Sequence, residues 1–411
     1  MRAVVTGIGA ITPIGLTGHE TWENLVAGVS GAGKIESFDA SGLPVQIAAE
    51  VKGFEPGKYM DAKAARRMSR FAQFAVAAAK TAADDAKLAI SDDERHRGAV
   101  SIATGAGGVL ETIAEATALR EKGPKRVSPF YVPMMAPNMG ACQVAMQLNL
   151  RGPALASVAA CASGLYSYIE AQNLIKSGVA DVVLAGGSES CVHPLPIAGL
   201  ANMKALSRRN DEPEAACRPF DRDRDGFLFG EGAVVMVVES EERAAGRGAR
   251  IYAELCGGGL SSDAYHITAP REDGTGAQHA MTAALAAAGL EPDDVDYIAA
   301  HGTGTLMNDA AETVAIKLAF GQHAEKLAIS SPKSMVGHLL GAAGAVGALA
   351  AAMAIYEETV PPTINLDNAD PACDLDYVPG KARSGPVRAA AANGFGFGGQ
   401  NGSVIFRKYT S

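Results

Sequence analysis

The chain has 411 residues, of which 48% are hydrophobic and 20% charged, a balance typical of a globular protein with a large core. A net charge of −9 argues against nucleic acid as a partner. The six cysteines contain no Cys-x-x-Cys pair, which argues against a disulfide framework or a zinc site. The first residues resemble a strand rather than a signal peptide, and apolar windows are interrupted by charges or by Gly and Pro. We therefore expect no membrane span and a cytoplasmic location.

The first part of the chain alternates predicted strands and helices. A strand opens the chain, and helices are expected near 20–27 and, rich in alanine, over 69–89. A further strand over 100–104 ends in a glycine-rich turn, and a helix follows from Leu110. This order is typical of an α/β protein.

The most informative stretch surrounds Cys161. The apolar run 153–160 predicts a short buried strand, and a helical pattern extends from Ala162 to about Lys176. Cys161 lies on the sharp turn between them, at a helix N-terminus, where free N–H groups and the helix dipole favour the thiolate. A lone cysteine is more often a buried structural thiol, so other motifs must decide its role.

The second half of the chain repeats this pattern. A strand over 233–239 precedes a polar stretch at 240–250, which we take as the boundary between halves 1–245 and 246–411. Another strand ends at His301, and His338 opens a helix of small residues. Two halves that each carry strand, reactive residue and small-residue helix suggest an internal duplication.

Four separate motifs carry a specific resemblance. They are Ala-Ala-Cys161-Ala-Ser-Gly, His301-Gly-Thr-Gly-Thr, Lys333-Ser-Met-Val-Gly-His338 and the glycine-rich segment 393–401. In this order they resemble the elongating β-ketoacyl-acyl-carrier-protein synthases of the thiolase superfamily, most closely the type II synthases of fatty-acid synthesis. The resemblance covers essentially the whole chain. It implies a five-layered αβαβα fold built from two duplicated halves, and a homodimer whose sheets continue across an interface near 154–160.

The resemblance also implies a reaction and its catalytic residues. Cys161 would take an acyl group from a carrier-protein thioester, and a malonyl thioester would lose carbon dioxide. The carbanion would attack the acyl-cysteine and give a 3-oxoacyl chain two carbons longer. His301 and His338 would stabilise the enolate, and the backbone N–H groups of Cys161 and Phe397 would form a second oxyanion hole. Lys333 would orient groups electrostatically and pair with Glu312. No metal or resident cofactor is implied, because phosphopantetheine arrives on the acyl carrier protein.

Other positions are implied with less definite roles. Asp309 and Asp263 match family carboxylates that either take part in the site or brace loops. Phe397 lies in segment 394–399, which we expect to be mobile, and is either a gate over the sulfur or a core residue. The acyl tunnel would be lined by Ala106, Tyr131 and Phe395. The docking surface for the carrier would use Lys63, Arg66, Arg67 and Lys204.

Competing classes differ from this chain at identifiable residues. A biosynthetic thiolase would carry a second cysteine in the C-terminal glycine-rich loop, where this chain has Phe395 and Phe397. A chain-initiating synthase would have asparagine in place of His338, and a non-catalytic chain-length subunit typically lacks the cysteine. The pathway stays open, because Leu306-Met307 and Gln400 depart from the usual fatty-acid pattern. The alternative is a ketosynthase of a type II or other specialised polyketide or polyene pathway, paired with a cysteine-less chain-length subunit.

Overall fold

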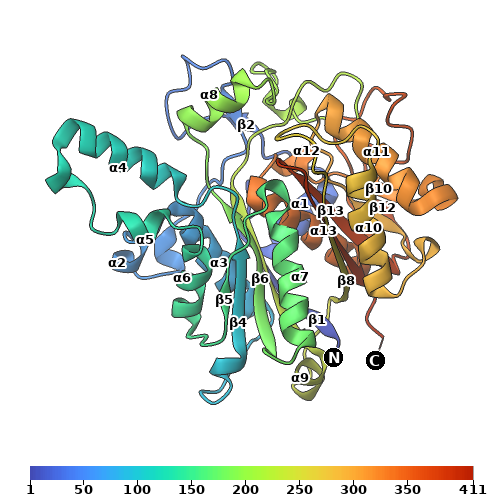
Figure 1. Cartoon of the computed structure of the whole chain (residues 1–411), viewed down its shortest axis with the longest axis horizontal. Helices are drawn as coiled ribbons and strands as arrows, with labels where there is room; N and C mark the ends of the chain where they lie inside the picture. The colour runs from blue at the N-terminus through green and yellow to red at the C-terminus, as the bar shows by residue number, and fades with distance from the viewer. Residues whose placement is uncertain (411) are drawn as a thin grey trace.

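The computed structural model describes residues 1–410. Its main sheet consists of two matched sets of five strands (Figure 1). The first set comprises β1 (Ala3–Ile11), β4 (Gly98–Ala103), β5 (Ala154–Leu155), β6 (Val182–Glu189) and β7 (Gly232–Ser240). The second comprises β8 (Ala253–Ser262), β9 (Tyr297–Ala299), β10 (Ala328–Ser330), β13 (Ala389–Gly396) and β14 (Gln400–Arg407). Across the sheet, the first set has the order β5-β4-β6-β7-β1 and the second has the order β10-β9-β13-β14-β8. When the strands of each set are renumbered in chain order, the two orders are identical.

The two sets join where β1 pairs antiparallel with β8, through Ala3–Val5 and Ala253–Leu255. The change from one set to the other falls between β7 and β8, where helix α9 (Glu241–Gly246) lies on the surface. The repeated topology explains why each half of the sequence has the same order of strand, reactive residue and helix.

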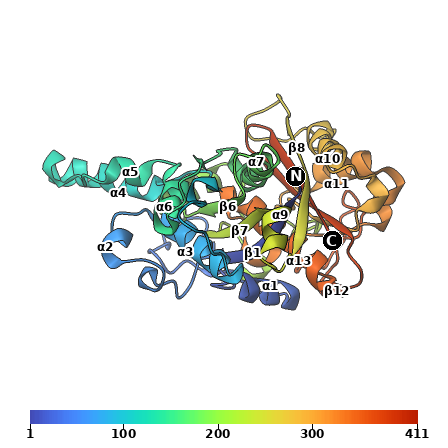
Figure 2. The same cartoon turned by 90° about the horizontal axis from the view of Figure 1, so that it is seen from below.

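Helices form three layers around the two sets of strands (Figures 1 and 2). The outer layers are α3 (Arg70–Asp85) with α6 (Met139–Leu148), and α10 (Thr275–Ala288) with α11 (Leu306–Phe320). Between the sets, α7 (Ser163–Lys176) and α13 (Ala343–Glu357) contact strands of both. This is the five-layered αβαβα arrangement predicted from the sequence.

The middle layer brings two helix N-termini together. Every residue of α13 from Ala343 to Ile355 is buried, so the apolar stretch Leu340–Glu357, which has the length of a membrane span, is a core helix. Gly164 of α7 approaches α13 so closely that a Cβ there would lie 2.7 Å from the Ala345 amide nitrogen. Cys161 precedes α7 and His338 precedes α13 in the chain. Because the two helices pack closely at their N-termini, the side chains of Cys161 and His338 lie next to each other.

Shorter elements surround the layers. They are α1 (Gly18–Ala27), α2 (Ala62–Ala65), α4 (Val109–Lys122), α5 (Tyr131–Met135), α8 (Pro194–Asn202), α12 (Lys333–Val336), β2 (Gly33–Lys34), β3 (Ile47–Ala48), β11 (Thr359–Val360) and β12 (Arg383–Ser384). The predicted buried strand over 153–160 is wrong in extent and burial. Only β5 forms there, at the edge of the sheet, and Val158 is 52% exposed. β5 pairs only with β4, so no neighbouring strand of the described chain covers the other edge of this apolar run.

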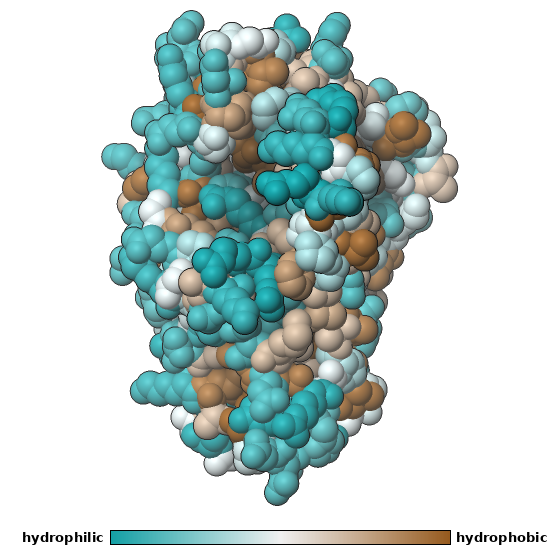
Figure 3. Space-filling model, turned by 90° about the vertical axis from the view of Figure 1, so that its left-hand side faces the viewer, coloured by the Kyte–Doolittle hydropathy of each residue, from teal (hydrophilic) through white to brown (hydrophobic). Residues whose placement is uncertain are grey.

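Helices α4 and α5 form an arm that projects from the body on the same side as β5 (Figures 1 and 2). Neither helix contains a buried residue. Figure 3 views this side of the molecule and shows apolar surface among the polar groups. Exposed apolar side chains on the arm, on α6 and beside β5 are Leu119, Phe130, Val132, Met135, Met146 and Val158. A monomer rarely exposes so many large apolar groups in one region.

Candidate active site

Cys161 lies in a strained turn immediately before α7. The turn spans Ala160–Ala162, and Ala160 has a φ of +47°, which is unusual for a residue with a side chain. The Ser163 hydroxyl stabilises the turn, because it accepts the Ala159 N–H at 2.8 Å and donates to the Ala160 carbonyl at 2.6 Å. The sulfur is thereby held at the start of α7, with Cys161 only 6% exposed. Strain of this kind is typical of functional positions.

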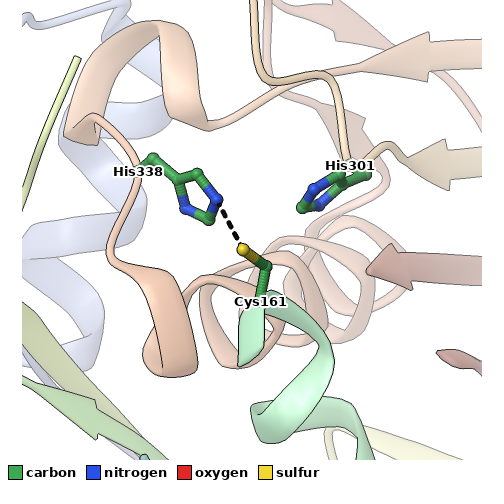
Figure 4. A group of neighbouring side chains, drawn as sticks. All are labelled: Cys161, His301 and His338. Atoms are coloured by element: carbon green, nitrogen blue, oxygen red, sulfur yellow. Dashed lines mark hydrogen bonds between the residues drawn. The ribbon is translucent and has the colours of Figure 1, made fainter. Parts of the chain in front are cut away.

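His338 faces the sulfur with a defined hydrogen-bonding role. Its Nε2 is 3.1 Å from Sγ of Cys161 (Figure 4), and its Nδ1 accepts the Leu340 backbone N–H at 3.1 Å. Burial, and the nearby Lys333, lower the pKa of His338 well below its usual value, so the ring is neutral at neutral pH. With Nδ1 used as an acceptor, the single ring proton lies on Nε2. His338 is therefore a hydrogen-bond donor toward the sulfur.

His301 completes the group from the end of β9. Its ring lies 5.5 Å from the His338 ring and 5.6 Å from the Phe395 ring, measured between centroids. Burial, Lys333 and His338 lower the pKa of His301 well below its usual value. Its Nδ1 has no hydrogen-bond partner among residues 1–410, so no acceptor holds the ring proton there and Nε2 can carry it. Both imidazoles are thus neutral, as the predicted enolate-stabilising role requires.

One ligand atom from each of Cys161, His301 and His338 lies within 4.8 Å of the others, a spacing that raises the question of a metal ion. The hydrogen bonding argues against one. A metal at Nε2 of His338 would force its proton onto Nδ1, which faces the Leu340 N–H. The buried Lys333 adds a positive charge beside the group. The chemistry of this site suits hydrogen-bond donation better than metal binding.

Lys333 and Glu312 stabilise His301 through its backbone. The Lys333 Nζ donates to the His301 carbonyl at 2.6 Å, and the Glu312 carboxylate accepts the N–H groups of His301 and Gly302 at 2.8 and 2.7 Å. No direct ion pair within 4 Å joins Lys333 and Glu312 among the described residues, but Glu312 is the strongest charge acting on Lys333, so they interact without direct contact. Burial raises the pKa of Glu312 to about 7 and lowers that of Lys333. Each instead binds one side of the same peptide segment.

The Cys161 thiol experiences opposing influences. Burial raises its pKa to about 11, while Lys333 and the backbone N–H groups of Phe397 and Cys161 act in the opposite direction. The expectation that the helix N-terminus favours the thiolate therefore describes only one contribution, and burial outweighs it. The two N–H groups that lower this pKa are the donors that the family resemblance assigns to a thioester oxyanion.

The glycine-rich segment forms a β-hairpin against the Cys161 turn. Gly394 and Gly396 belong to β13, and a Cβ on Gly396 would lie 2.7 Å from the Ala159 carbonyl oxygen. Gly398 and Gly399 form the turn with φ of +84° and +73°. We predicted mobility for this segment, but its glycines have a more specific use. They permit close approach and left-handed backbone, and Phe397, 39% exposed, lies at the tip.

Asp263 and Asp309 brace the loops of the site. Asp263 accepts from Asn401 Nδ2 at 2.7 Å, and its own N–H donates to the Gly399 carbonyl. Fully buried Asp309 accepts the N–H groups of Thr303 and Gly304, next to His301. These contacts favour the bracing interpretation for both carboxylates, although Asp263 also lines the cavity.

A cavity of about 350 Å³ opens above the three residues. Cys161, His301, His338, Phe395 and Phe397 line its inner part. Further lining residues, to which the sequence analysis gave no role in the site, include Met203, Thr268, Thr303, Thr305, Leu306, Met307 and Asn401. The two threonines were visible in the His-Gly-Thr-Gly-Thr motif, whereas Met203 and Thr268 carry no motif that would indicate a site.

Several predicted positions lie elsewhere. Ala106 is exposed after β4 and Tyr131 begins α5, and neither lines the cavity of the single chain. Lys63, Arg66 and Arg67 are exposed in or directly after α2, whereas Lys204 lines the cavity. The Arg67 guanidinium lies over the Phe130 ring, 4.6 Å from its centroid. The α2 cluster is thus in contact with the arm.

Comparison with known proteins assigns the chain to a family. The model of the β-ketoacyl synthase N-terminal domain matches residues 1–244, and that of the C-terminal domain matches 252–367. The chain belongs to the β-ketoacyl synthase family. It is 49% identical over 408 residues to the 3-oxoacyl-[acyl-carrier-protein] synthase 2 of Synechocystis sp. (strain PCC 6803), covering 99% of this chain and 98% of that protein.

Solved ketosynthases share the complete fold. The ishigamide ketosynthase/chain length factor superposes with a TM-score of 0.92 at 38% identity, covering 100% of this chain and 99% of that one. A ketosynthase bound to its type II polyketide acyl-carrier protein gives a TM-score of 0.91 at 35% identity, with coverage of 100% and 99%. The predicted family, fold and enzyme class are confirmed, and the chain is an acyltransferase of the ketosynthase type.

Proposed function

We propose that this enzyme condenses malonyl-acyl carrier protein with an acyl group on Cys161, releasing carbon dioxide and forming a 3-oxoacyl-acyl carrier protein two carbons longer. The observation that carries the proposal is the arrangement of one thiol and two neutral imidazoles around a single cavity, with Nε2 of His338 3.1 Å from Sγ. The reaction belongs to fatty-acid elongation in the cytoplasm.

The first half-reaction transfers the acyl group. Cys161 loses its thiol proton and its sulfur attacks the carbonyl carbon of the acyl thioester. The carbon–sulfur bond to the carrier breaks, and the leaving phosphopantetheine thiolate takes up the proton that Cys161 has lost. The N–H groups of Phe397 and Cys161, which lower the Cys161 pKa, would stabilise the tetrahedral oxyanion. His338 donates its Nε2 proton as a hydrogen bond that favours the thiolate. No resident cofactor takes part.

The second half-reaction begins at the histidines. When the bond to the malonyl carboxylate breaks, carbon dioxide leaves and the electron pair forms an enolate on the thioester. Neutral His301 and His338 donate N–H bonds to its oxygen, which stabilises charge without protonating the carbon. The enolate carbon then attacks the acyl-cysteine carbonyl. Collapse of that intermediate breaks the carbon–sulfur bond and returns the electron pair to Sγ.

Two surfaces of the chain support a second subunit and an acyl carrier protein as its partners. The α4–α5 arm and the edge strand β5 expose apolar residues on one side, which supports a homodimer formed by continuing the sheet at β5. The exposed basic residues Lys63, Arg66 and Arg67, with Lys204 at the cavity mouth, support docking of an acidic acyl carrier protein.

A polyketide role is the second candidate. The likeness to the ishigamide and type II polyketide ketosynthases favours it, as do Leu306 and Met307, which line the mouth and are 60% and 51% exposed. In this case a cysteine-less chain-length subunit would occupy the dimer interface.

The deciding experiment uses the purified protein with acyl- and malonyl-acyl carrier proteins and identifies products by mass spectrometry. A single two-carbon extension by the protein alone supports fatty-acid elongation. Repeated extension without reduction, only after a cysteine-less partner is added, supports the polyketide role. No condensation under either condition contradicts the proposal.

A further inference from the structure

Glu189, the last residue of β6, is a fully buried carboxylate with an unusual set of partners. Buried Glu231 and Glu239 are each paired with arginine, whereas Glu189 forms no ion pair with any described residue. Instead its two oxygens accept from five groups, which are Thr104 Oγ1 at 2.9 Å, Cys191 Sγ at 3.3 Å, and the backbone N–H groups of Gly105 at 2.6 Å, Ala106 at 3.3 Å and Gly341 at 3.1 Å. Burying a charge held only by dipoles is costly, so these contacts require an explanation.

These donors come from two separate turns. Three belong to the turn 104–106 after β4, and one belongs to the turn 338–341 that carries His338. The turns are in direct backbone contact, since a Cβ on Gly341 would collide with the Gly105 amide nitrogen. A Cβ on Gly105 would lie 2.8 Å from the Glu189 Oε2 atom itself. Glu189 therefore binds both turns at the point where they touch.

The Gly341 contact leads directly to the His338 ring. Glu189 accepts the Gly341 N–H, and the preceding amide, that of Leu340, donates to Nδ1 of His338. Leu340 has a φ of +44°, a left-handed conformation that a leucine adopts only when its surroundings hold it there. The carboxylate thus holds the peptide unit directly after the one whose N–H keeps the His338 proton on Nε2, with only Leu340 between them.

We propose that Glu189 is a positioning residue that holds the turn 104–106 and the His338 turn together, so that His338 keeps its donor toward Sγ and toward the malonyl enolate. The role rests on the proposed function for its effect on catalysis, but the geometry at Cys161 can also be measured without substrate.

Two substitutions at Glu189 distinguish the effect of its contacts with the two turns from the effect of its negative charge. Glu189→Ala and Glu189→Gln both remove the negative charge near Cys161. The glutamine carbonyl can still accept from Gly105 and Gly341, while its NH₂ group faces the Thr104 hydroxyl and the Cys191 thiol, which can rotate to accept. The NH₂ group loses only the long Ala106 N–H contact of 3.3 Å, so both turns remain joined through the carbonyl. In a Cys161→Ala background, we expect malonyl-acyl carrier protein decarboxylation to be at least about tenfold slower with alanine than with glutamine. The glutamine variant should stay within about threefold of the Glu189 parent.

The second readout is alkylation of Cys161 by iodoacetamide at one pH, followed on the Cys161 peptide by mass spectrometry. We expect alanine to react at least about threefold more slowly than glutamine, because a displaced His338 no longer stabilises the thiolate. If the wild-type enzyme fails to decarboxylate malonyl-acyl carrier protein, the proposed function is wrong, and the alkylation ratio still tests Glu189.

A matched control is Glu239→Ala. Glu239 is equally buried and binds Thr6, Arg243 and Arg247, none of which lines the cavity. It should lower the melting temperature without changing either readout. If Glu189→Ala does not fold, Gly341→Ala takes its place, because the added Cβ forces the two turns apart. It should slow both malonyl decarboxylation and Cys161 alkylation. Equal rates for the alanine and glutamine variants, or for Gly341→Ala and wild type, would show that Glu189 only stabilises the fold.

Discussion

Leu340 donates its backbone N–H to Nδ1 of His338, and this contact determines what His338 can do for Cys161, 3.1 Å away. A neutral imidazole that accepts at Nδ1 carries its proton on Nε2, so His338 cannot also accept the thiol proton at that nitrogen. It supports the reaction by donating a hydrogen bond to a negative sulfur or to a negative thioester oxygen. His338 therefore acts as a donor in both steps, whereas the nucleophilic attack belongs to Cys161 alone.

Removing the nucleophile should separate the two steps. Cys161→Ala is expected to abolish acyl loading and condensation but to retain some malonyl decarboxylation, because both histidines remain. Loading is measured by the mass of the acyl-enzyme and decarboxylation by carbon dioxide release. A Cys161→Ala protein that still condenses would contradict the assignment of Cys161.

Removing either histidine should have the opposite effect. His301→Ala and His338→Ala are expected to lower decarboxylation by about 10²–10³-fold, the usual cost of losing one oxyanion donor. Cys161 should still be acylated, because the N–H groups of Phe397 and Cys161 remain. Acyl loading and carbon dioxide release are measured on the same variants, so each assay is the control for the other. Loss of acylation equal to the loss of decarboxylation would mean that the histidines act mainly on the thiol.

The thiol should titrate far above neutral pH. Since burial raises the Cys161 pKa to about 11, the reactive thiolate fraction increases as pH rises. We expect the iodoacetamide rate at Cys161 to increase about tenfold per pH unit between pH 7 and 9, as the Cys161 peptide reports. A plateau below pH 8 would show that the helix N-terminus, the N–H donors and His338 together outweigh burial.

Local pattern indicates the repeated halves, whereas the five layers and the Cys-His-His group follow from the family resemblance that the four motifs carry. The His338 tautomer, by contrast, depends on a contact with Leu340 that involves only backbone. Glu189 was missed because nothing in a Ser-Glu-Ser segment reveals that donors from two distant turns meet there. The contacts of Lys333 and Glu312 could not be foreseen for the same reason, since both residues bind the His301 backbone.

Charge reversal in the basic cluster tests carrier docking. Lys63→Glu with Arg67→Glu should raise the Michaelis constant for acyl carrier protein, more strongly at low salt, because attraction between exposed charges is screened by ions. Activity on a small acyl thioester without the carrier should hardly change. Lys326→Glu with Lys381→Glu is the matched control, since both lysines are exposed, lie outside the cavity and change the net charge equally. Equal loss on both substrates would mean that the cluster is structural, for instance through the Arg67–Phe130 contact.

Acyl chain length should depend on Ala106. Its side chain is exposed after β4 in the single chain, so a tunnel wall there requires a second subunit, whose Phe130–Tyr131 segment the resemblance places beside it. Burying one methylene is worth about 0.8 kcal/mol, or a three- to fourfold preference per carbon. Ala106→Phe should therefore slow the loading of long acyl carriers while short ones load normally.

The measurement is the rate of Cys161 acylation by carriers of increasing chain length. Ala245→Phe, which adds the same volume to an exposed alanine of α9, is the control and should leave the profile unchanged. If the Ala106→Phe enzyme loads long chains as fast as short ones, Ala106 does not line the tunnel. In that case Tyr131 or another side chain already fills the space that the small alanine leaves, and chain length is determined elsewhere.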